Sequence, residues 1–357
     1  MRKFFFFSAT LIIIILLTND ILAQDDFFTP KTTIGGYGEL HYNNENPEVG
    51  STSKTLDFHR FVLFVSHSWS EKWSFKSEVE IEHNFIKSGQ GELEIEQAFL
   101  NFQPSENIGF QAGVIVPSIG LINPYHEPPL FFGVERPEYS KYIIPTTWFG
   151  NGAAMYGNFN DFTFKLSVME GLNSDKFSAN KGIRGGRQNG FKSDASKFLY
   201  SANIDYLGLP GLMFGGSFTY NEAKGNTTEN KITLTEFHGK YDANNLIAVF
   251  EFGNISYNSG NIENSRGYYF DLGYNLKEVL KSESDIIPFF RYTDYNTAAN
   301  TISGGIIETQ NHFSKWMIGV SVKPIPSIVV KVDYSQRERE LESLKTKLFN
   351  LGVGYMF

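Results

Sequence analysis

The chain has 357 residues, a formal net charge of −8 and no cysteine. The lack of thiols excludes disulfide bonds, thiolate metal sites and lipidation on cysteine. The acidic balance, with no basic stripe, argues against a nucleic-acid partner. Phe and Tyr are abundant, with 34 and 18 residues, as the interface girdles and lipid-facing positions of a membrane barrel require.

The first segment, Met1–Ala23, has the pattern of a secretory signal peptide. Its charged start is followed by an apolar run that is too short to span a bilayer as a helix. We predict cleavage after Ala23, a short periplasmic lead-in at Gln24–Thr33 and one β-barrel domain over Ile34–Phe357. An N-terminal membrane anchor is the alternative. Such a signal exports the mature chain from the cytoplasm, and a barrel of this kind would then lie in the cell outer membrane.

Segments of alternating apolar and polar residues recur along the whole mature chain, bounded by turn residues. This period-two pattern predicts about 16 strands of an antiparallel, transmembrane β-barrel. The segments are Ile34–Asn43, Thr55–Trp69, Trp73–Asn84, Glu92–Gln103, Ile108–Pro117, Gly152–Phe159, Phe162–Glu170, Lys197–Tyr206, Leu212–Asn221, Ile232–Tyr241, Leu246–Tyr257, Arg266–Leu276, Ile286–Asn296, His312–Lys323, Ile328–Gln336 and Lys347–Phe357.

The connections between these segments alternate in length. Odd-numbered connections are long, such as Ser118–Asn151 and Gly171–Ser196, and even-numbered ones are mostly short, such as Asn160-Asp161. Long loops on one rim and short turns on the other are typical of outer-membrane barrels. A soluble β-sandwich, the alternative fold, gives no reason for this regularity.

Charged residues within the strands fall on one face. In Ile328–Tyr334, the residues Lys331 and Asp333 alternate with Ile328, Val330 and Val332. A Lys or Arg at the lipid midplane costs roughly 2–4 kcal/mol, so the charged face should point into the barrel. We therefore expect a lumen that contains water rather than a dry packed interior.

The last strand alternates up to the final residue, with Tyr355 and Phe357 on its apolar face. A terminal aromatic suits the interface girdle of a membrane barrel. The ending also resembles the C-terminal signal by which the β-barrel assembly machinery recognises outer-membrane proteins. We therefore assign Tyr355 and Phe357 to an assembly signal.

Several motifs in the first half resemble the phosphate-selective porin O/P family of bacterial outer-membrane porins. They are Asp57–Phe61, Trp73–Lys76, Gly109–Pro117, Phe132–Pro137, Ile144-Pro145 and Gly150–Gly157. The resemblance covers about Ile34–Glu170. It implies a 16-stranded porin, often a homotrimer, whose fifth connection folds into the lumen. Phosphate-selective members line the pore with Arg and Lys, whereas the matching region here is rich in Glu, so phosphate selectivity is not carried over.

The fifth connection, Ser118–Asn151, is the candidate constriction. It is long, shows no alternation and is rich in aromatics and prolines, which favours an ordered loop. Folded inward, it would narrow the pore and place mixed charge there; a loop lying over the external surface is the alternative. The charged candidates in it are His126, Glu127, Glu135 and Arg136.

A carboxylate patch is the second candidate. One strand carries Lys76 and three glutamates on one face, and the next strand carries three more; these glutamates are Glu78, Glu80, Glu82, Glu92, Glu94 and Glu96. A hairpin centred near Lys87 would pair them as 82 with 92, 80 with 94 and 78 with 96. Rings of acid select cations, so the patch reads either as a cation-attracting wall or as an inert wet wall. A bound divalent cation is a further possibility.

Basic residues could stand on the opposite wall of the lumen. The candidates are Arg60, Lys165, Arg266, Arg291 and Lys331. Cation or anion selectivity therefore stays open at this stage.

The sequence contains none of the common local motifs of hydrolases, zinc peptidases or nucleotide-binding enzymes. Its seven histidines are scattered along the chain, and we predict no metal site and no cofactor. The function that fits best is a porin for passive diffusion of small hydrophilic solutes or ions. The alternatives are a solute-specific uptake channel for an anion or oligosaccharide, and a non-channel barrel that acts as an adhesin or hydrolase.

Overall fold

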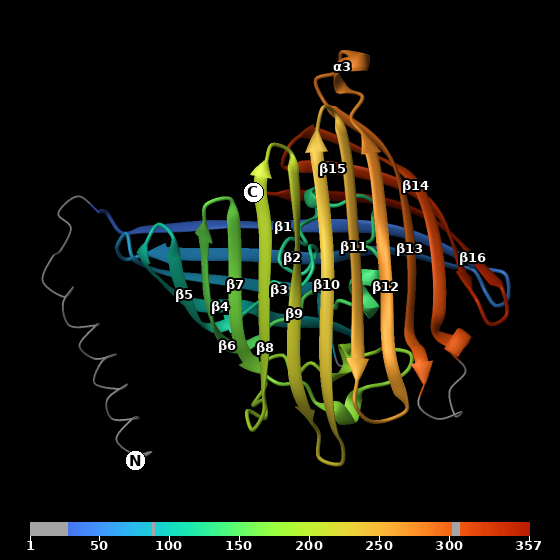
Figure 1. The fold of residues 1–357 in the computed structure, drawn as a ribbon. Coiled ribbons are helices and arrows are strands. Elements are labelled where there is room, and N and C mark those ends of the chain that lie inside the picture. Colours follow the sequence, from blue (N-terminus) through green and yellow to red (C-terminus); the bar gives the residue numbers. More distant parts are fainter. Residues whose placement is uncertain (1–27, 88–89, 302–307) are drawn as a thin grey trace, which may run out of the picture.

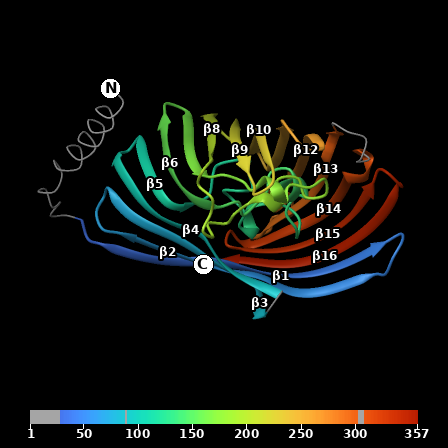
Figure 2. The same ribbon diagram turned by 90° about the horizontal axis from the view of Figure 1, so that it is seen from below.

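The computed structural model describes residues 28–87, 90–301 and 308–357. The predicted signal peptide and residues 24–27 of the lead-in lie outside the described residues, and the end of the lead-in, from Lys31, already belongs to the first strand. Within them, 16 antiparallel strands form a closed barrel in which each strand pairs with its sequence neighbours and β1 pairs with β16. The predicted fold class and strand count are therefore confirmed. In Figure 1, β1–β3 cross the view while β9–β12 run up it, and Figure 2 shows the same wall from below.

Every predicted segment corresponds to one strand. The strands are β1 (Lys31–Pro47), β2 (Ser53–Ser68), β3 (Trp73–Lys87), β4 (Gln90–Ser105), β5 (Ile108–Ile115), β6 (Gly150–Phe159), β7 (Phe162–Glu170), β8 (Phe198–Leu209), β9 (Leu212–Lys224), β10 (Glu229–Ala243), β11 (Leu246–Tyr257), β12 (Ile262–Tyr274), β13 (Asp285–Thr301), β14 (His312–Ile325), β15 (Ile328–Arg339) and β16 (Leu344–Met356).

Most strands extend beyond their predicted ends, so several loops are shorter than expected. Four residues join β9 to β10, β11 to β12 and β15 to β16, because polar residues near the rim still pair across the ladder. The longest connections on that rim are 116–149 and 171–197. The other rim has short turns except at 275–284, which contains α3 (Lys277–Leu280).

The alternation in sequence corresponds to two chemically distinct faces. Val330 and Val332 of β15 are 45% and 36% exposed, whereas Lys331 and Asp333, which alternate with them, are 3% and 1% exposed. The same holds for β16, where Leu351 is exposed and Asn350 is buried. The outer face is thus apolar and open to its surroundings, and the inner face is polar and covered.

The inner face is covered mainly by the two long connections. The segment 116–149 contains η1 (Pro128–Leu130) and α2 (Tyr139–Tyr142), and the segment 171–197 contains η2 (Ser174–Lys176) and η3 (Arg184–Gly186). Their apolar side chains pack with inward-facing residues of several strands into one buried cluster, whose largest members include Trp148 and Tyr139. The expectation of an interior without dry packing is therefore wrong for this part of the barrel.

Candidate functional site

The inner face of β1–β3 carries a buried ion-pair network centred on Arg60. Its guanidinium Nε lies 2.6 Å from Oε1 of Glu39, and Nη1 lies 3.4 Å from Oε1 of Glu80. All three residues are at most 6% exposed. One guanidinium thus neutralises parts of two carboxylates that water does not reach. Arg60 stands within the acidic wall, because β2 is the direct neighbour of β3, and its predicted place on the opposite wall is wrong.

The carboxylate patch has the predicted register at only two of its three pairs. Glu82 pairs with Glu92 and Glu80 with Glu94. A β-bulge then shifts the ladder, so Glu78 pairs with Gln97 and Glu96 becomes the extra residue. The predicted pairing of Glu78 with Glu96 is wrong, because the extra residue reverses the alternation of the strand: Glu96 faces inward, whereas Leu100 beyond it is 47% exposed.

The carboxylates of Glu78 and Glu96 nevertheless lie close to the same side chain, that of His126 in the segment 116–149. His126 places Nε2 at 3.5 Å from Oε1 of Glu78 and at 3.4 Å from Oε2 of Glu96. Burial alone would lower the pKa of His126, but the two carboxylates outweigh burial and raise this pKa to about 10. The ring Nδ1 meets the backbone carbonyl oxygen of Asn123 at 2.9 Å.

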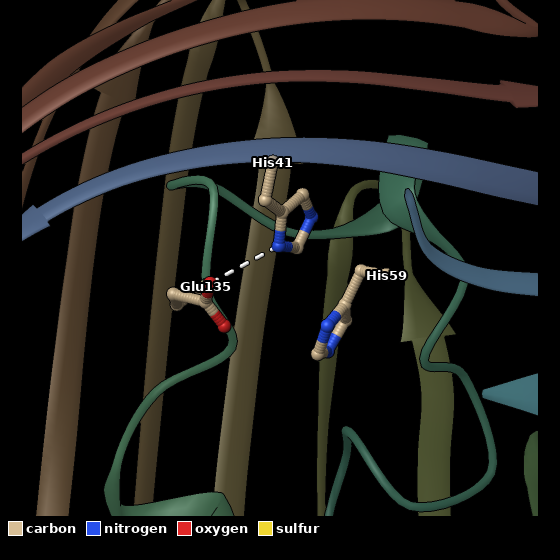
Figure 3. A group of neighbouring side chains, drawn as sticks. All are labelled: His41, His59 and Glu135. Atoms are coloured by element: carbon tan, nitrogen blue, oxygen red, sulfur yellow. Dashed lines mark hydrogen bonds and ion pairs between the residues drawn. The ribbon is translucent and has the colours of Figure 1, made fainter. Parts of the chain in front are cut away.

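A second cluster lies beside the first and joins β1, β2 and the same segment (Figure 3). Nδ1 of His41 is 3.0 Å from Oε1 of Glu135, and Nε2 of His41 is 3.1 Å from Oε2 of Glu39. The ring of His59 stacks on that of His41 with centroids 4.7 Å apart. Burial would raise the pKa of Glu135, but hydrogen bonds from His41 and Asn43 hold it well below its usual range.

The histidines are therefore less scattered than the sequence suggested. His83 of β3 shares Asp57 with His59, at 2.8 and 3.1 Å. Three of the seven histidines therefore gather on one wall, namely His41, His59 and His83. Sequence reasoning missed His41, Asp57 and Glu39 as network members. The alternating pattern could have identified Glu39 and His41, because they lie on the face of β1 opposite to Leu40, which is 40% exposed.

The segment 116–149 also contacts the wall formed by β12, β13 and β15. Arg291 of β13 donates two hydrogen bonds to Asp271, from Nε at 2.6 Å and Nη2 at 2.8 Å. It also donates to the carbonyl oxygens of Glu135 and Phe132, at 3.1 and 2.9 Å. The backbone N–H of Val134 donates to Oδ2 of Asp333 at 2.7 Å. The segment is thus anchored to acidic and basic residues on both sides of the interior.

Further basic residues hold neighbouring parts of this segment. Nζ of Lys331 lies 3.8 Å from the ring centroid of Phe131, a cation–π geometry. Nζ of Lys315 lies 3.1 Å from Oε1 of Glu138. Lys165 donates to the carbonyl oxygen of Val116 at 2.9 Å.

The remaining predicted residues differ in position and in exposure. Glu127 and Arg136 belong to the anchored segment, and Arg136 donates to the carbonyl oxygen of His126 at 3.0 Å. Lys76 and Glu92 are on exposed parts of their strands. Arg266 is exposed and shares its face with the outward Tyr268, so its predicted inward position is wrong. Glu78, Glu80 and Glu96 are buried, so lumen water does not separate them as the sequence analysis expected.

A cavity of about 480 Å³ lies between this segment and the wall of β5–β10. It is lined by residues of the short-turn rim, such as Asn107 and Leu207, and by inward side chains such as Lys165 and Asp205. Tyr125 enters it from the segment 116–149 and is 61% exposed. The volume lies within the roughly 300–1,000 Å³ range of small-molecule sites. The cavity is therefore large enough for a small hydrophilic solute.

Comparison with solved structures finds the same barrel fold in several outer-membrane proteins. The matches include OmpF of Salmonella typhi in complex with daunomycin (TM-score 0.64, 13% identity, 92% of this chain and 98% of that chain covered). They also include an anion-selective porin from Comamonas acidovorans (0.63, 10%, 92% and 100%) and the outer-membrane channel DcaP of Acinetobacter baumannii (0.59, 11%, 92% and 97%). At these identities the likeness shows the fold.

The chain is also similar to an uncharacterised protein of Aquifex aeolicus (strain VF5), with 29% identity over 351 residues that cover 91% of this chain and 80% of that protein. No family model matches the sequence. Among the described residues, no helix combines the length and the apolar character needed to cross a bilayer.

Proposed function

We propose that this protein is an outer-membrane channel for the passive diffusion of small hydrophilic solutes. The observation that carries the proposal is a closed barrel with an apolar outer face whose polar interior keeps a cavity of about 480 Å³ at the short-turn rim. A lipid-facing apolar band around a charged interior is the arrangement of membrane channels. The titles of several structural neighbours name channels and porins, which supports the same conclusion.

The permeation path would run along the cavity, between the segment 116–149 and the wall of β5–β10. The buried ion pairs of Arg60 and Arg291 fill the opposite side of the interior, and the apolar cluster packs against β7–β13 nearer the long-loop rim. The segment 116–149 would thus act as the constriction, with Tyr125 and Lys165 at its water-exposed edge. This arrangement predicts a low unit conductance and passage of small solutes only.

Within this proposal, the carboxylate patch has a smaller role in selectivity than its composition suggests. Glu78, Glu80 and Glu96 are buried beside Arg60 and His126, and charges that water does not reach attract few ions from solution. Glu82, Glu92 and Glu94 remain as the more accessible part of the patch. The C-terminal strand would carry the assembly signal, and export would depend on the predicted signal peptide.

Planar-bilayer conductance of the purified barrel tests the proposal. Tyr125→Ala should raise the unit conductance because it removes a large side chain from the cavity. Phe191→Ala is the matched control, since Phe191 is 82% exposed and does not line the cavity. An absence of channels from the folded wild-type protein would refute the proposal. Saturable block of the current by one solute would instead identify a solute-specific uptake channel.

A further inference from the structure

We propose that Glu78, Glu96 and His126 form a binding site for a divalent transition-metal ion that cross-links the segment 116–149 to the β3–β4 hairpin. One ligand atom from each residue is available, and these atoms all lie within 4.8 Å of one another. All three residues are at most 4% exposed. The binding of a metal ion here does not require the barrel to conduct, so this proposal is tested independently of the proposed channel function.

The first argument is that three carboxylate oxygens here make no hydrogen bond within the described residues, although two of them face Nε2 of His126 at 3.4 and 3.5 Å. Both carboxylate oxygens of Glu96 and Oε1 of Glu78 are buried without a hydrogen-bond partner among the described residues. An unpartnered buried charge is costly, and Glu96 is only 1% exposed. The Oε2 atom of Glu78 is already satisfied by Nε2 of Gln97 at 2.5 Å, which leaves Oε1 directed at the site.

The second argument is the spacing of the ligand atoms. Charge-assisted N–H···O contacts have lengths of about 2.7–2.9 Å, whereas Nε2 of His126 is 3.4 and 3.5 Å from the two carboxylate oxygens. Ligands about 2.1 Å from a tetrahedral zinc ion lie about 3.4 Å from one another. The observed separations match the edge of a coordination polyhedron better than a pair of direct hydrogen bonds.

The third argument is the orientation of the imidazole ring. Nδ1 of His126 donates to the backbone carbonyl oxygen of Asn123 at 2.9 Å, which leaves Nε2 as the nitrogen that faces the two carboxylates, and a metal ion that binds there would displace the Nε2 proton. Metal-ligating histidines have this outer-shell support, which fixes the tautomer. A divalent ion would also neutralise both carboxylates, whereas a proton on His126 would neutralise one.

The neighbouring cluster of His41, His59 and Glu135 is a weaker candidate, although its atoms are equally close. Figure 3 shows the ring of His41 directed at Glu135, and both of its nitrogens already contact carboxylates. The ring of His59 lies nearly parallel to that of His41, with an interplanar angle of 19°. No atom of this cluster is buried without a partner in the described residues.

A mixed set of one imidazole and two carboxylates suits zinc and its divalent neighbours. The test uses the full-length folded barrel in detergent, stripped with EDTA, loaded with Zn²⁺ and desalted. Elemental analysis should find one tightly bound zinc per chain. Glu96→Gln and His126→Gln should abolish this zinc, and Gln97→Ala should weaken its affinity by about 10–100-fold through loss of outer-shell support. His67→Gln, which removes a histidine that contacts Thr32 instead, should bind zinc like the wild type.

Circular dichroism of each variant verifies that the barrel is folded before zinc is counted. The unfolding midpoint in urea gives a second readout, since zinc should raise it in the wild type and in His67→Gln and leave it unchanged in Glu96→Gln. Three results would overturn the proposal. They are no zinc in the wild type, undiminished zinc in Glu96→Gln, and loss of zinc in His59→Gln, which would place the ion in the neighbouring cluster.

Discussion

Replacing Arg291 by Met tests how the segment 116–149 is held inside the barrel. The side chain is 2% exposed, pairs with Asp271 at 2.6 and 2.8 Å and donates to two carbonyl oxygens of the segment. Removing one partner of a buried ion pair costs about 3–5 kcal/mol, because the other charge stays buried and unpaired. The same change frees the carbonyl groups of Phe132 and Glu135. We therefore expect a loss of about 3–5 kcal/mol in the free energy of unfolding and faster proteolysis of the segment.

Two further variants separate the causes of this loss. Arg339→Met is the matched control, since Arg339 pairs with Glu342 at 3.1 Å on a partly exposed surface and exposed pairs contribute about 0–1 kcal/mol. The double variant Asp271→Leu/Arg291→Met removes both buried charges, so it should recover most of the stability. It should not recover protection of the segment, because the hydrogen bonds to its carbonyl groups stay absent.

The assays are urea unfolding of the barrel in lipid vesicles and limited proteolysis followed by mass spectrometry. The reasoning is refuted if Arg291→Met costs no more than Arg339→Met. It is also refuted if the double variant is as unstable as Arg291→Met alone, since the loss would then not arise from the unpaired Asp271.

Three other predictions follow from the structure. Burial would raise the pKa of Glu138, but nearby lysine and arginine lower this pKa. The ionised Glu138 should therefore stabilise the folded barrel fully above a pH of about 4.3, the usual pKa of Glu. This stabilisation should be lost as the pH falls through the lowered pKa of the folded state. In the wild type, the rate of proteolysis of the segment 116–149 should therefore rise as the pH falls. This rise should be weaker in Glu138→Gln, whereas Glu342→Gln, at an exposed position, should behave like the wild type. Gly113→Ala should destabilise the barrel in urea unfolding, because φ there is +142° and an added Cβ would lie 2.2 Å from a backbone oxygen. Gly239→Ala is the control and should be nearly neutral, because its Cβ would lie 3.8 Å from the nearest atom. Deleting Phe357 removes two backbone hydrogen bonds to Gly36 and should lower the amount of folded barrel in outer-membrane fractions; an unchanged amount would contradict the assembly role.

The strands and their faces were predictable from the sequence because alternation is a local property. An inward lysine between outward valines, as at Lys331, is visible without any partner strand. The placement of Arg266 was wrong for a related reason: its charge suggested the inner face, while its parity with Tyr268 indicated the outer one. Parity is the better guide near the rim, where water reaches both faces.

The sequence by itself determined the closed barrel of 16 strands, the split into apolar and polar faces, and the position of the long fifth connection. Tertiary structure alone decided which inward charges meet, because those contacts join strands and loops that are far apart in the chain. The bulge at Glu96, the two carboxylates around His126 and the anchoring of the segment 116–149 by Arg291 all depend on register and on loop packing. The alternating pattern of one strand does not specify which residues of other strands or loops it will contact. These contacts therefore form only when the barrel closes around the segment 116–149.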